Sequence, residues 1–410
     1  MKVVMISDFF DENLEYQENL VSETCIKQGH DVTFVTSTFR SVFDYLTDRH
    51  DATAAPSTYV AKGIKVVRLR YRWNVMNKIR RFTPIDGILD SEKPDLIYAH
   101  DITLNFPEAV RHLRRNPSCR MIMDYHADRT NSGKNWLSRT ILHGVIRRHY
   151  LSQARRYLSK IFPVVPGGMD FLREHYGVRD SEMELLPLAI DMTSARRIRE
   201  EKQGCNLRAK LGISEGDIVV FTGGKFTPLK RTELAITAIS KLAHLPIHLI
   251  VIGEGEKSYP DYSAKVFATG QGLPNVHYVG WQDREGVFKC LDAADFAVFP
   301  ASQSVLWQQA IGMGLPLVVG DLGGQDPSYL NAHDNMVILS PDEITAERIS
   351  EEISRLAVDA SLRERMSRGA DLVADEYLDW DKVIQKVLRF VEIPAASPGG
   401  VLTPSASKAN

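Results

Sequence analysis

Short apolar runs alternate with amphipathic stretches along most of the chain, and this alternation constrains the fold more than any other feature. Continuous apolar strands separated by helices are typical of parallel sheets that helices cover on both faces. The runs fall into two series, one in each half of the chain, so the sequence predicts two doubly wound α/β domains. They are KVVMIS (2–7), DVTFVTS (31–37), IKVVRLR (64–70), DLIYAH (95–100), RMIMDYH (120–126) and IFPVVPG (161–167), then DIVVFTGG (217–224), IHLIVIGEG (247–255), VHYVG (276–280), FAVFPAS (296–302), PLVVGD (316–321) and MVILSP (336–341).

The two series meet in a polar, charged stretch at 192–212, which we expect to connect domains spanning 1–195 and 205–375. A last helical stretch ends near Glu392, and the Pro/Gly/Ser-rich residues 393–410 are expected to be disordered. Ligands of open α/β sheets bind beyond the carboxyl ends of the strands. Two such domains facing one another predict a cleft between them that holds the chemistry.

Composition limits the class of protein. With 410 residues, 44% hydrophobic and 25% charged, the chain is long enough for two soluble domains. The four cysteines lie far apart with no CxxC pair, which argues against zinc and disulfides and favours a reducing cytosol. The opening MKVVMISDFF lacks a signal-peptide pattern, and no apolar run approaches the roughly 18 residues of a membrane helix. We therefore expect a cytoplasmic protein, at most peripheral on a membrane.

The stretch VVFTGGKFTPLKRTELAITAI, residues 219–239, places two glycines and two lysines where a strand gives way to a helix. Gly223 and Gly224 let the backbone approach a ligand closely, and N–H groups at a helix start attract anions. Lys225 and Lys230 add two charges, which match a diphosphate, and Thr232 is a candidate N-cap. The alternative is two solvated surface lysines. The loop lacks the Walker pattern, and no nicotinamide fingerprint opens a helix elsewhere.

TGGKFTPLKR resembles the donor-diphosphate loop of the retaining glycosyltransferases of family 4, which have the GT-B fold. The resemblance extends to MKVVMISDFF…GHDVTFVTS, YVGWQDREGVFKCLDAADFAVFPAS and QAIGMGLPLVVGD. It implies that Lys225 and Lys230 hold a nucleotide diphosphate, and we expect Lys230 to be exposed in the empty cleft. It also implies that the final helix, 376–392, which begins near Trp380, crosses back to the first domain.

The sequence departs from this family where two glutamates usually stand eight positions apart. Here the stretch is PASQSVLWQQAIGMG, with Gln309 at the second position and Gln303 or Ser304 as the nearest substitute for the first. An amide can accept from a ribose hydroxyl, but without the charge that strengthens the bond. The departure fits either a sugar pocket that makes different contacts with the donor or an enzyme whose activity is reduced or lost. LEYQENL likewise stands where many family members have a pair of glycines. Its residues Tyr16 to Asn19 either line the cleft or simply form the first turn of a helix.

Retaining transfer in this family is described as front-face and metal-free, with the leaving diphosphate taking the acceptor's proton. Cations must then stabilise the charge that grows on the diphosphate. The resemblance adds His126, which would touch the donor sugar, to Lys225 and Lys230 as catalytic candidates. Asp101, which ends a neighbouring strand, is a further candidate that would orient the acceptor. Alternatively, each residue has a purely structural role: His126 is hydrogen-bonded at the end of its strand, and Asp101 caps the following helix. Glu254 and Gly255 complete the donor-binding candidates.

Residues 134–160 carry seven Lys or Arg and no acid, with apolar residues at helical spacing that include Trp136, Leu137, Ile141 and Val145. A basic amphipathic helix can dock on anionic lipid, whereas the alternative packs its apolar face on the sheet. No nucleic-acid motif accompanies the charge, so nucleic acid is not an expected partner.

The sequence therefore predicts a metal-independent retaining glycosyltransferase that needs no cofactor. It would move a sugar from a nucleotide-sugar donor, a UDP-sugar by default, to a glycan or lipid-linked acceptor in bacterial surface polysaccharide, lipopolysaccharide or glycolipid synthesis. Two alternatives stay open. One is a catalytically impaired partner subunit that binds a nucleotide sugar, and the other is a GT-B sugar-nucleotide epimerase.

Overall fold

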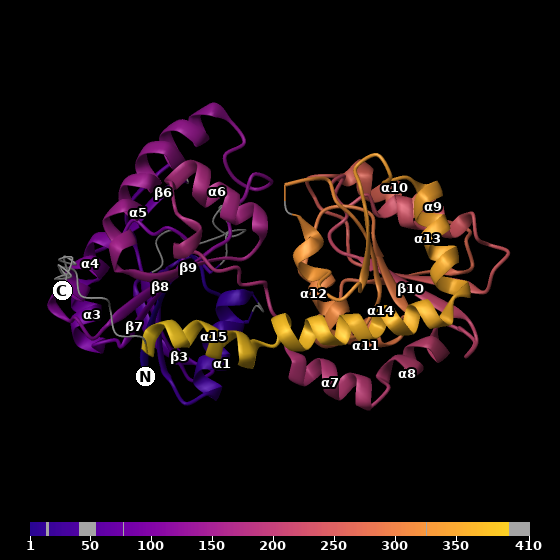
Figure 1. Ribbon diagram of the computed structural model, residues 1–410, viewed down its shortest axis with the longest axis horizontal. Coiled ribbons are helices and arrows are strands. Elements are labelled where there is room, and N and C mark those ends of the chain that lie inside the picture. Colours follow the sequence, from indigo (N-terminus) through magenta and orange to yellow (C-terminus); the bar gives the residue numbers. More distant parts are fainter. Residues whose placement is uncertain (14–15, 41–54, 77, 325, 393–410) are drawn as a thin grey trace, which may run out of the picture.

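The protein has two α/β domains side by side, joined at one end by the connecting chain and by the C-terminal helices (Figure 1). The computed structural model describes residues 1–13, 16–40, 55–76, 78–324 and 326–392. The tail expected to be disordered, 393–410, lies outside the described residues.

The first domain is built on a seven-stranded sheet with the strand order β3-β4-β2-β1-β7-β8-β9. All of its strands pair in parallel except β3, which runs antiparallel along β4 at the edge. The strands are β1 (Lys2–Ile6), β2 (Asp31–Ser37), β3 (Ser57–Ala61), β4 (Ile64–Leu69), β7 (Leu96–His100), β8 (Arg120–Tyr125) and β9 (Leu158–Pro163). A separate hairpin joins β5 (Tyr71–Val75) and β6 (Ile79–Phe82).

The second domain has a six-stranded, fully parallel sheet with the order β12-β11-β10-β13-β14-β15. Its strand order reverses beside β10, and sheets of this type bind ligands at such a point. The strands are β10 (Ile218–Gly223), β11 (Ile247–Ile252), β12 (Val276–Gly280), β13 (Phe296–Phe299), β14 (Leu317–Gly320) and β15 (Met336–Leu339).

Helices cover both faces of each sheet, and an apolar cluster is buried on each face. In the first domain the helices are α1 (Gln17–Lys27), α3 (Asp86–Glu92), α4 (Phe106–Arg115), the π-helix η1 (Ser138–Arg147), α5 (Arg148–Ala154), α6 (Pro166–Tyr176) and the short turns η2 (Arg155–Tyr157) and η3 (Asp180–Glu182). The others are α7 (Met192–Glu200), α8 (Gln203–Lys210), α9 (Thr232–Ser240), α10 (Pro260–Gly270), α11 (Arg284–Asp292), α12 (Val305–Gly312), η4 (Pro327–Leu330), α13 (Ala346–Val358), α14 (Ala360–Val373), η5 (Ala374–Leu378) and α15 (Trp380–Glu392).

All twelve apolar runs form strands of the two sheets, which confirms the predicted fold class. The hairpin β5–β6 was not predicted, because YRWNV and IRRF carry too many basic residues to show an apolar alternation. The basic stretch 134–160 was expected to be helical to its end, but β9 already begins at Leu158.

Helix α15 ties the end of the chain to the first domain (Figure 1, yellow). Its Trp380, Val383 and Ile384 are buried in the apolar cluster that also contains Val3 and Met5 of β1. On the same side, Nζ of Lys27 in α1 lies 2.7 Å from the Asp381 carboxylate. The C-terminal segment thus leaves the second domain and completes the core of the first.

Replacing Ile384 by Ala should lower the free energy of unfolding by about 2–5 kcal/mol, because it leaves a cavity in a closed apolar cluster. Denaturant unfolding followed by circular dichroism measures the change. The matched control is Leu372→Ala on α14, whose side chain is half exposed, and it should change stability by less than about 0.5 kcal/mol. Equal losses in the two variants would contradict the packing of α15.

Candidate functional site

A buried carboxylate organises the carboxyl edge of the first sheet. Asp124 of β8 is fully buried, and its Oδ2 lies 2.7 Å from Nδ1 of His100 at the end of β7. The Gln17 side chain donates to the same oxygen at 3.3 Å from the start of α1. Burial opposes ionisation of Asp124, but His100 and His126 outweigh it and hold the pKa of that carboxyl below its usual range. Asp124 is therefore the fixed negative charge of this edge.

His126 follows β8 and keeps part of its ring accessible, with 32% of the side chain exposed. Its Nε2 lies 3.4 Å from Oδ1 of Asp124. Burial alone would lower the pKa of His126, but the Asp124 charge and hydrogen bond, with Asp101 and Glu18 nearby, raise it to about 9. At neutral pH the ring is an imidazolium, so it can stabilise negative charge but cannot act as a general base.

Asp101 directly follows β7 and has a left-handed backbone, with φ of 63°. Its N–H donates to the backbone oxygen of Asp124 at 3.2 Å, and its Oδ1 accepts the N–H of His126 at 3.0 Å. The cap of the next helix, α4, is Asn105 rather than Asp101. Asp101 thus fixes the backbone position of His126. The same two hydrogen bonds hold Asp101 in a left-handed backbone conformation that is strained for a residue other than glycine.

Helix α1 brings a further carboxylate, Glu18, which belongs to the stretch Tyr16 to Asn19 expected to line the cleft. Tyr16 is the exposed N-cap residue of α1, and the next residue, Gln17, donates to Asp124. Burial raises the pKa of Glu18, although His100 and His126 act against this rise.

His100, Asp124 and His126 are also the described residues that could hold a metal ion, since their ligand atoms lie within 4.8 Å of one another. Ligands held at about 2.0–2.2 Å in a tetrahedral array lie about 3.4 Å apart. The 2.7 Å between His100 and Asp124 is instead a direct, charge-assisted hydrogen bond. The geometry fits a histidine–carboxylate network better than a metal centre.

Two glycine turns lie against each other at the carboxyl edge of the second sheet. Gly224 and Gly253 both have positive φ, and a Cβ on Gly253 would lie 2.0 Å from the oxygen of Gly224. The turns are joined by the N–H of Phe226, which donates to the oxygen of Glu254 at 3.0 Å. The predicted donor residues Gly223, Gly224, Glu254 and Gly255 therefore form one backbone surface, with the Glu254 side chain exposed.

Lys225 and Lys230 differ in their surroundings. Nζ of Lys225 lies 3.6 Å from the carboxylate of Glu256, and the side chain is half exposed. Lys230 was expected to be exposed, but it is partly buried, and its Nζ donates to the backbone oxygens of Ser302 and Gln303 at 2.7 and 3.0 Å. Burial lowers the pKa of Lys230 to about 8. The prediction of exposure is wrong because Lys230 bridges the loops that follow β10 and β13.

The expected N-cap Thr232 is also wrong. Thr232 is the first residue of α9, and the capping residue is Arg231, which has a left-handed backbone with φ of 50°. The N–H of Thr232 donates instead to the Tyr262 hydroxyl at 2.9 Å.

Neutral amides surround the start of α12. Gln303 donates to the Tyr329 hydroxyl at 2.6 Å, while its Oε1 is buried without a partner in the described structure. Ser304 Oγ and Gln309 Oε1 are likewise buried and unpartnered in this part of the chain. Buried polar atoms without partners are rare, so these atoms are available to a ligand. Gln303 and Ser304 lie on the loop that Lys230 holds, and Gln309 lies within α12.

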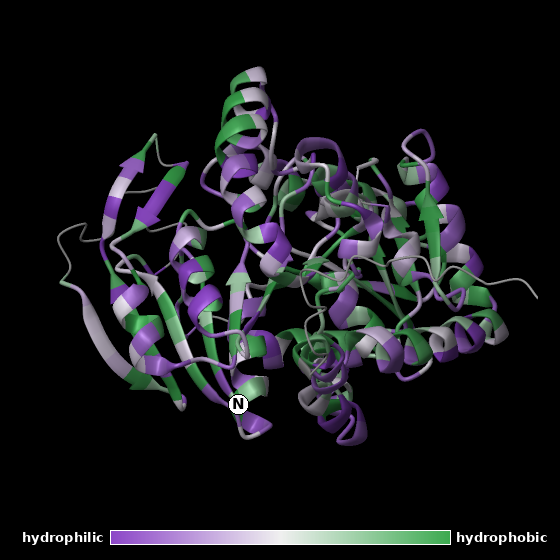
Figure 2. Ribbon diagram, turned by 60° about the vertical axis from the view of Figure 1, so that its left-hand side comes forward, coloured by the Kyte–Doolittle hydropathy of each residue, from purple (hydrophilic) through white to green (hydrophobic). Residues whose placement is uncertain are grey.

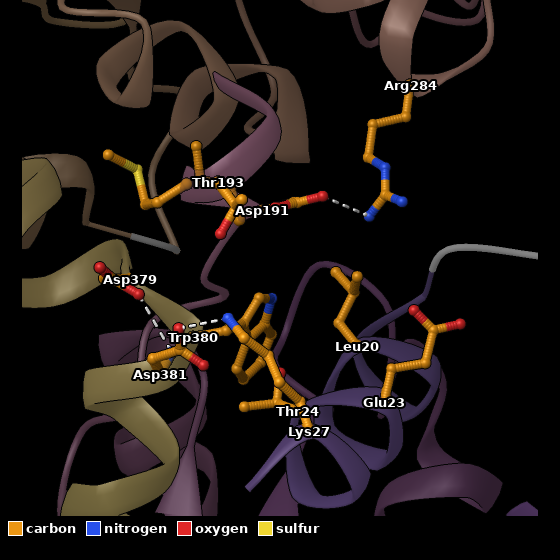
Figure 3. Close-up of a pocket in the computed structure, with 12 residues that line it drawn as sticks. Leu20, Glu23, Thr24, Lys27, Asp191, Thr193, Arg284, Asp379, Trp380 and Asp381 are labelled. Carbon is orange, nitrogen blue, oxygen red and sulfur yellow. Dashed lines mark hydrogen bonds and ion pairs between the residues drawn. The ribbon is translucent and has the colours of Figure 1, made fainter. Parts of the chain in front are cut away.

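The two edges approach each other across the domain junction. A Cβ on Gly324, after β14, would lie 3.3 Å from Cγ2 of Thr130 in the loop that follows His126. A pocket of about 250 Å³ lies where α1, the connecting chain and α15 meet, and none of the predicted site residues line it. Figure 3 shows ion pairs there, Arg284 with Asp191 at 3.4 Å and Lys27 with Asp381. The first pair joins α11 of the second domain to the connecting chain, and the second joins α1 to α15.

Comparisons with known proteins match both halves of the chain. Residues 216–359 match the family "Glycosyl transferases group 1", and residues 16–189 match "Glycosyl transferase 4-like domain". The chain is 24% identical over 177 residues to the D-inositol 3-phosphate glycosyltransferase of Rhodococcus erythropolis, a stretch that covers 41% of this chain and 39% of that relative. The chain thus spans less than half the length of that relative.

Solved structures are similar over nearly the whole chain. HepE of Anabaena in complex with UDP has a TM-score of 0.68 at 15% identity and covers 96% of this chain and 100% of its own. WaaG, a glycosyltransferase involved in lipopolysaccharide biosynthesis, has a TM-score of 0.56 at 16% identity and covers 95% of this chain and 99% of its own. At this identity the likeness shows the fold, in agreement with the fold expected from the sequence.

The raised pKa of His126 gives a titration test. The His126 ring should titrate near pH 9 in nuclear magnetic resonance spectra, and in Asp124→Asn its midpoint should fall toward the ordinary value of about 6.5. Because the folded pKa is raised, the stability from this pair is full below about pH 6.5 and lost as the pH rises through about 9. A wild-type midpoint near 6.5 would contradict the assignment, whether or not the variant folds.

Lys230→Ala should lower the free energy of unfolding by about 1–3 kcal/mol, because it removes the donor to two backbone oxygens. Lys225→Ala on the same loop is the matched control, and its half-exposed pair should contribute less than about 1 kcal/mol. Thermal unfolding of both variants measures the difference. If Lys225→Ala is the more destabilised variant, the bridging role of Lys230 is wrong.

Proposed function

The chain belongs to the group 1 glycosyltransferases and has the GT-B fold, and we propose that it transfers a sugar with retention from a nucleotide-sugar donor to a glycan or lipid-linked acceptor. One observation carries this proposal. Glycine turns and a partly buried, bridging lysine lie at the carboxyl edge of the second sheet, an imidazolium lies at the carboxyl edge of the first, and the loops that follow the two edges meet at Gly324 and Thr130. Both edges therefore offer positive charge to an anion at the domain junction.

In the proposed reaction the bond between the anomeric carbon and a diphosphate oxygen breaks, and its electron pair stays on the diphosphate. The acceptor oxygen bonds to the same face of the sugar, and its proton passes to the departing diphosphate. Lys225 and Lys230 stabilise the charge that develops on the leaving group, which is the kind of contribution that dominates many enzymes. No residue of this chain is needed as a base, which agrees with a protonated His126.

His126 supplies a hydrogen-bond donor and a positive charge on the side of the donor sugar. Asp124 and Asp101 act through it, since Asp124 keeps the ring protonated and Asp101 fixes its backbone. The chemistry proceeds without a metal in this proposal, because two lysines and an imidazolium can provide the charge that a cation would otherwise supply.

The donor and pathway are proposed from the neighbours. HepE was solved with UDP, which supports a UDP-sugar as donor, and WaaG supports a role in surface polysaccharide, lipopolysaccharide or glycolipid synthesis. Among the described residues, no helix is long and apolar enough to cross a membrane. We place the enzyme in the cytoplasm, peripheral on the membrane through residues 134–160.

The amides at α12 favour a second candidate, a partner subunit that binds a nucleotide sugar without turnover. Gln303 and Gln309 stand near or at positions where the family has glutamates, and their unpartnered oxygens can accept hydroxyl groups without providing charge. Transfer or hydrolysis of the donor distinguishes the enzyme from the partner subunit. A product that remains a free nucleotide sugar would instead indicate an epimerase.

Calorimetric titration with UDP, GDP and ADP tests the donor site. We expect one diphosphate to bind, and Lys225→Ala/Lys230→Ala to weaken it by at least about 100-fold, since each charge-assisted bond contributes about 1.5–3 kcal/mol. Lys210→Ala/Lys241→Ala, which removes two exposed lysines at the ends of α8 and α9, is the control and should bind normally. Failure of all three nucleotides to bind to the wild type would contradict the proposal.

A further inference from the structure

A second pocket, larger than the one at the domain junction, lies in the first domain. Its volume is about 560 Å³, and its walls come from the hairpin β5–β6, the loop 131–135 and the π-helix η1. The hairpin was not predicted from the sequence, and nothing in the reaction described above uses this pocket. Among its lining residues are Met76, Lys78, Lys134, Leu137, Ile141 and Arg147.

The pocket is surrounded by apolar side chains that face outward. Met76 is 77% exposed and Trp136 68%, and Leu137 and Ile141 are also exposed. Figure 2 shows the hairpin and the helix formed by η1 and α5 projecting from the first domain, both with hydrophobic bands between hydrophilic ones. Single exposed apolar residues are ordinary, but several around one pocket indicate a ligand or a docking surface.

The charges at this pocket are positive. Lys78, Lys134 and Arg147 line it, and no carboxylate within the described ranges forms an ion pair with any of them. Elsewhere in the basic stretch the situation differs, since Arg155 pairs with Glu182. Cations left unpaired beside an apolar pocket favour a ligand that carries both an anion and an apolar chain.

His143 keeps the floor of the pocket uncharged. It is buried, and its Nδ1 lies 2.6 Å from the Tyr176 hydroxyl. Burial, with Arg147 and His175 nearby, lowers the pKa of His143 to about 3, so the ring is neutral in the physiological range. The wall that carries it is π-helical over Ser138–Arg147, and such segments are rare and occur frequently at functional sites.

The pocket is connected to the candidate active site by a short loop. Asn131 lines the pocket, and its Nδ2 donates to the backbone oxygen of His126 at 2.9 Å. The loop between them is held by Asp128, whose Oδ1 accepts the N–H groups of Thr130 and Asn131. A ligand in the pocket therefore lies one loop away from the imidazolium.

We propose that this pocket binds the phosphate and the first part of the apolar chain of the acceptor, which is a lipid phosphate. The inference rests on the proposed function, in which the acceptor meets the donor at His126. Lys78 and Lys134 bind the phosphate, and Met76, Leu137 and Ile141 contact the chain. The glycan part of the same molecule extends past Asn131 toward the donor sugar.

Calorimetric titration of the full chain with three probes tests the pocket. Decyl phosphate below its micellar concentration carries both features, inorganic phosphate carries the anion alone, and decyl glucoside carries the chain alone. We expect decyl phosphate to bind at least about tenfold more tightly than either of the others. Equal binding of inorganic phosphate would show a plain anion site, and equal binding of decyl glucoside a plain apolar patch. Either result overturns the proposal.

Variants locate the binding. Lys78→Gln/Lys134→Gln and, separately, Ile141→Asp should each weaken decyl phosphate by about tenfold. The controls are Lys210→Gln/Lys241→Gln and Val358→Asp, which alter exposed residues of the second half of the chain and should leave binding unchanged. Losses as large in the controls, or none in the pocket variants, would place the amphiphile elsewhere and overturn the inference.

Nucleotide binding separates this inference from the function on which it rests. UDP, GDP or ADP, whichever the wild type binds, should bind the pocket variants with unchanged affinity. A protein that binds nucleotide but shows no preference for decyl phosphate contradicts the pocket alone. A protein that binds no nucleotide contradicts the proposed function, and with it the role of the pocket in that function.

Discussion

The first domain's edge depends on one buried charge, the Asp124 carboxylate. A buried ion costs several kcal/mol unless it is paired and hydrogen-bonded, so the elements that supply its partners must be held in place. Those partners come from three elements: His100 at the end of β7, His126 after β8 and Gln17 at the start of α1. The same charge that fixes this arrangement keeps His126 protonated. The Asp124 carboxylate therefore both positions its partner side chains and keeps His126 positively charged.

The second domain also holds a positive charge at the carboxyl edge of its sheet, but without a buried carboxylate. Lys230 has two backbone oxygens as partners in place of a carboxylate, and burial brings its pKa to about 8. Such a lysine is still mostly charged at neutral pH. Its backbone partners carry no net charge, so its positive charge can still attract an anion. The glycine turns at Gly224 and Gly253 keep the neighbouring backbone free of side chains. Both edges are thus organised before any anion arrives, so little reorganisation is needed on binding.

Local patterns in the sequence predicted the strands and the lysine loop, because apolar runs and glycine turns depend on neighbouring residues. The pairing of His100 with Asp124 could not be read in this way, since it joins residues 24 positions apart whose strands become neighbours only in the folded sheet. The burial of Lys230 was missed for the same reason, because its partners Ser302 and Gln303 follow a different strand. The hairpin β5–β6 lacked the expected apolar alternation, and its contacts are with distant segments: Arg80 pairs with Asp8 and Arg81 with Glu108.

The neutral amides at α12 also affect the charge at the edge of the second sheet. A glutamate near Lys230 would neutralise part of its charge, whereas Gln303 and Gln309 leave the positive field at the donor edge intact. An amide still orients a hydroxyl, but with a weaker bond than a carboxylate provides. In the proposed reaction, this exchange would shift binding energy from the sugar and ribose toward the diphosphate. Because stabilisation of the diphosphate would grow as the leaving group separates, the shift would favour the transition state over the bound donor.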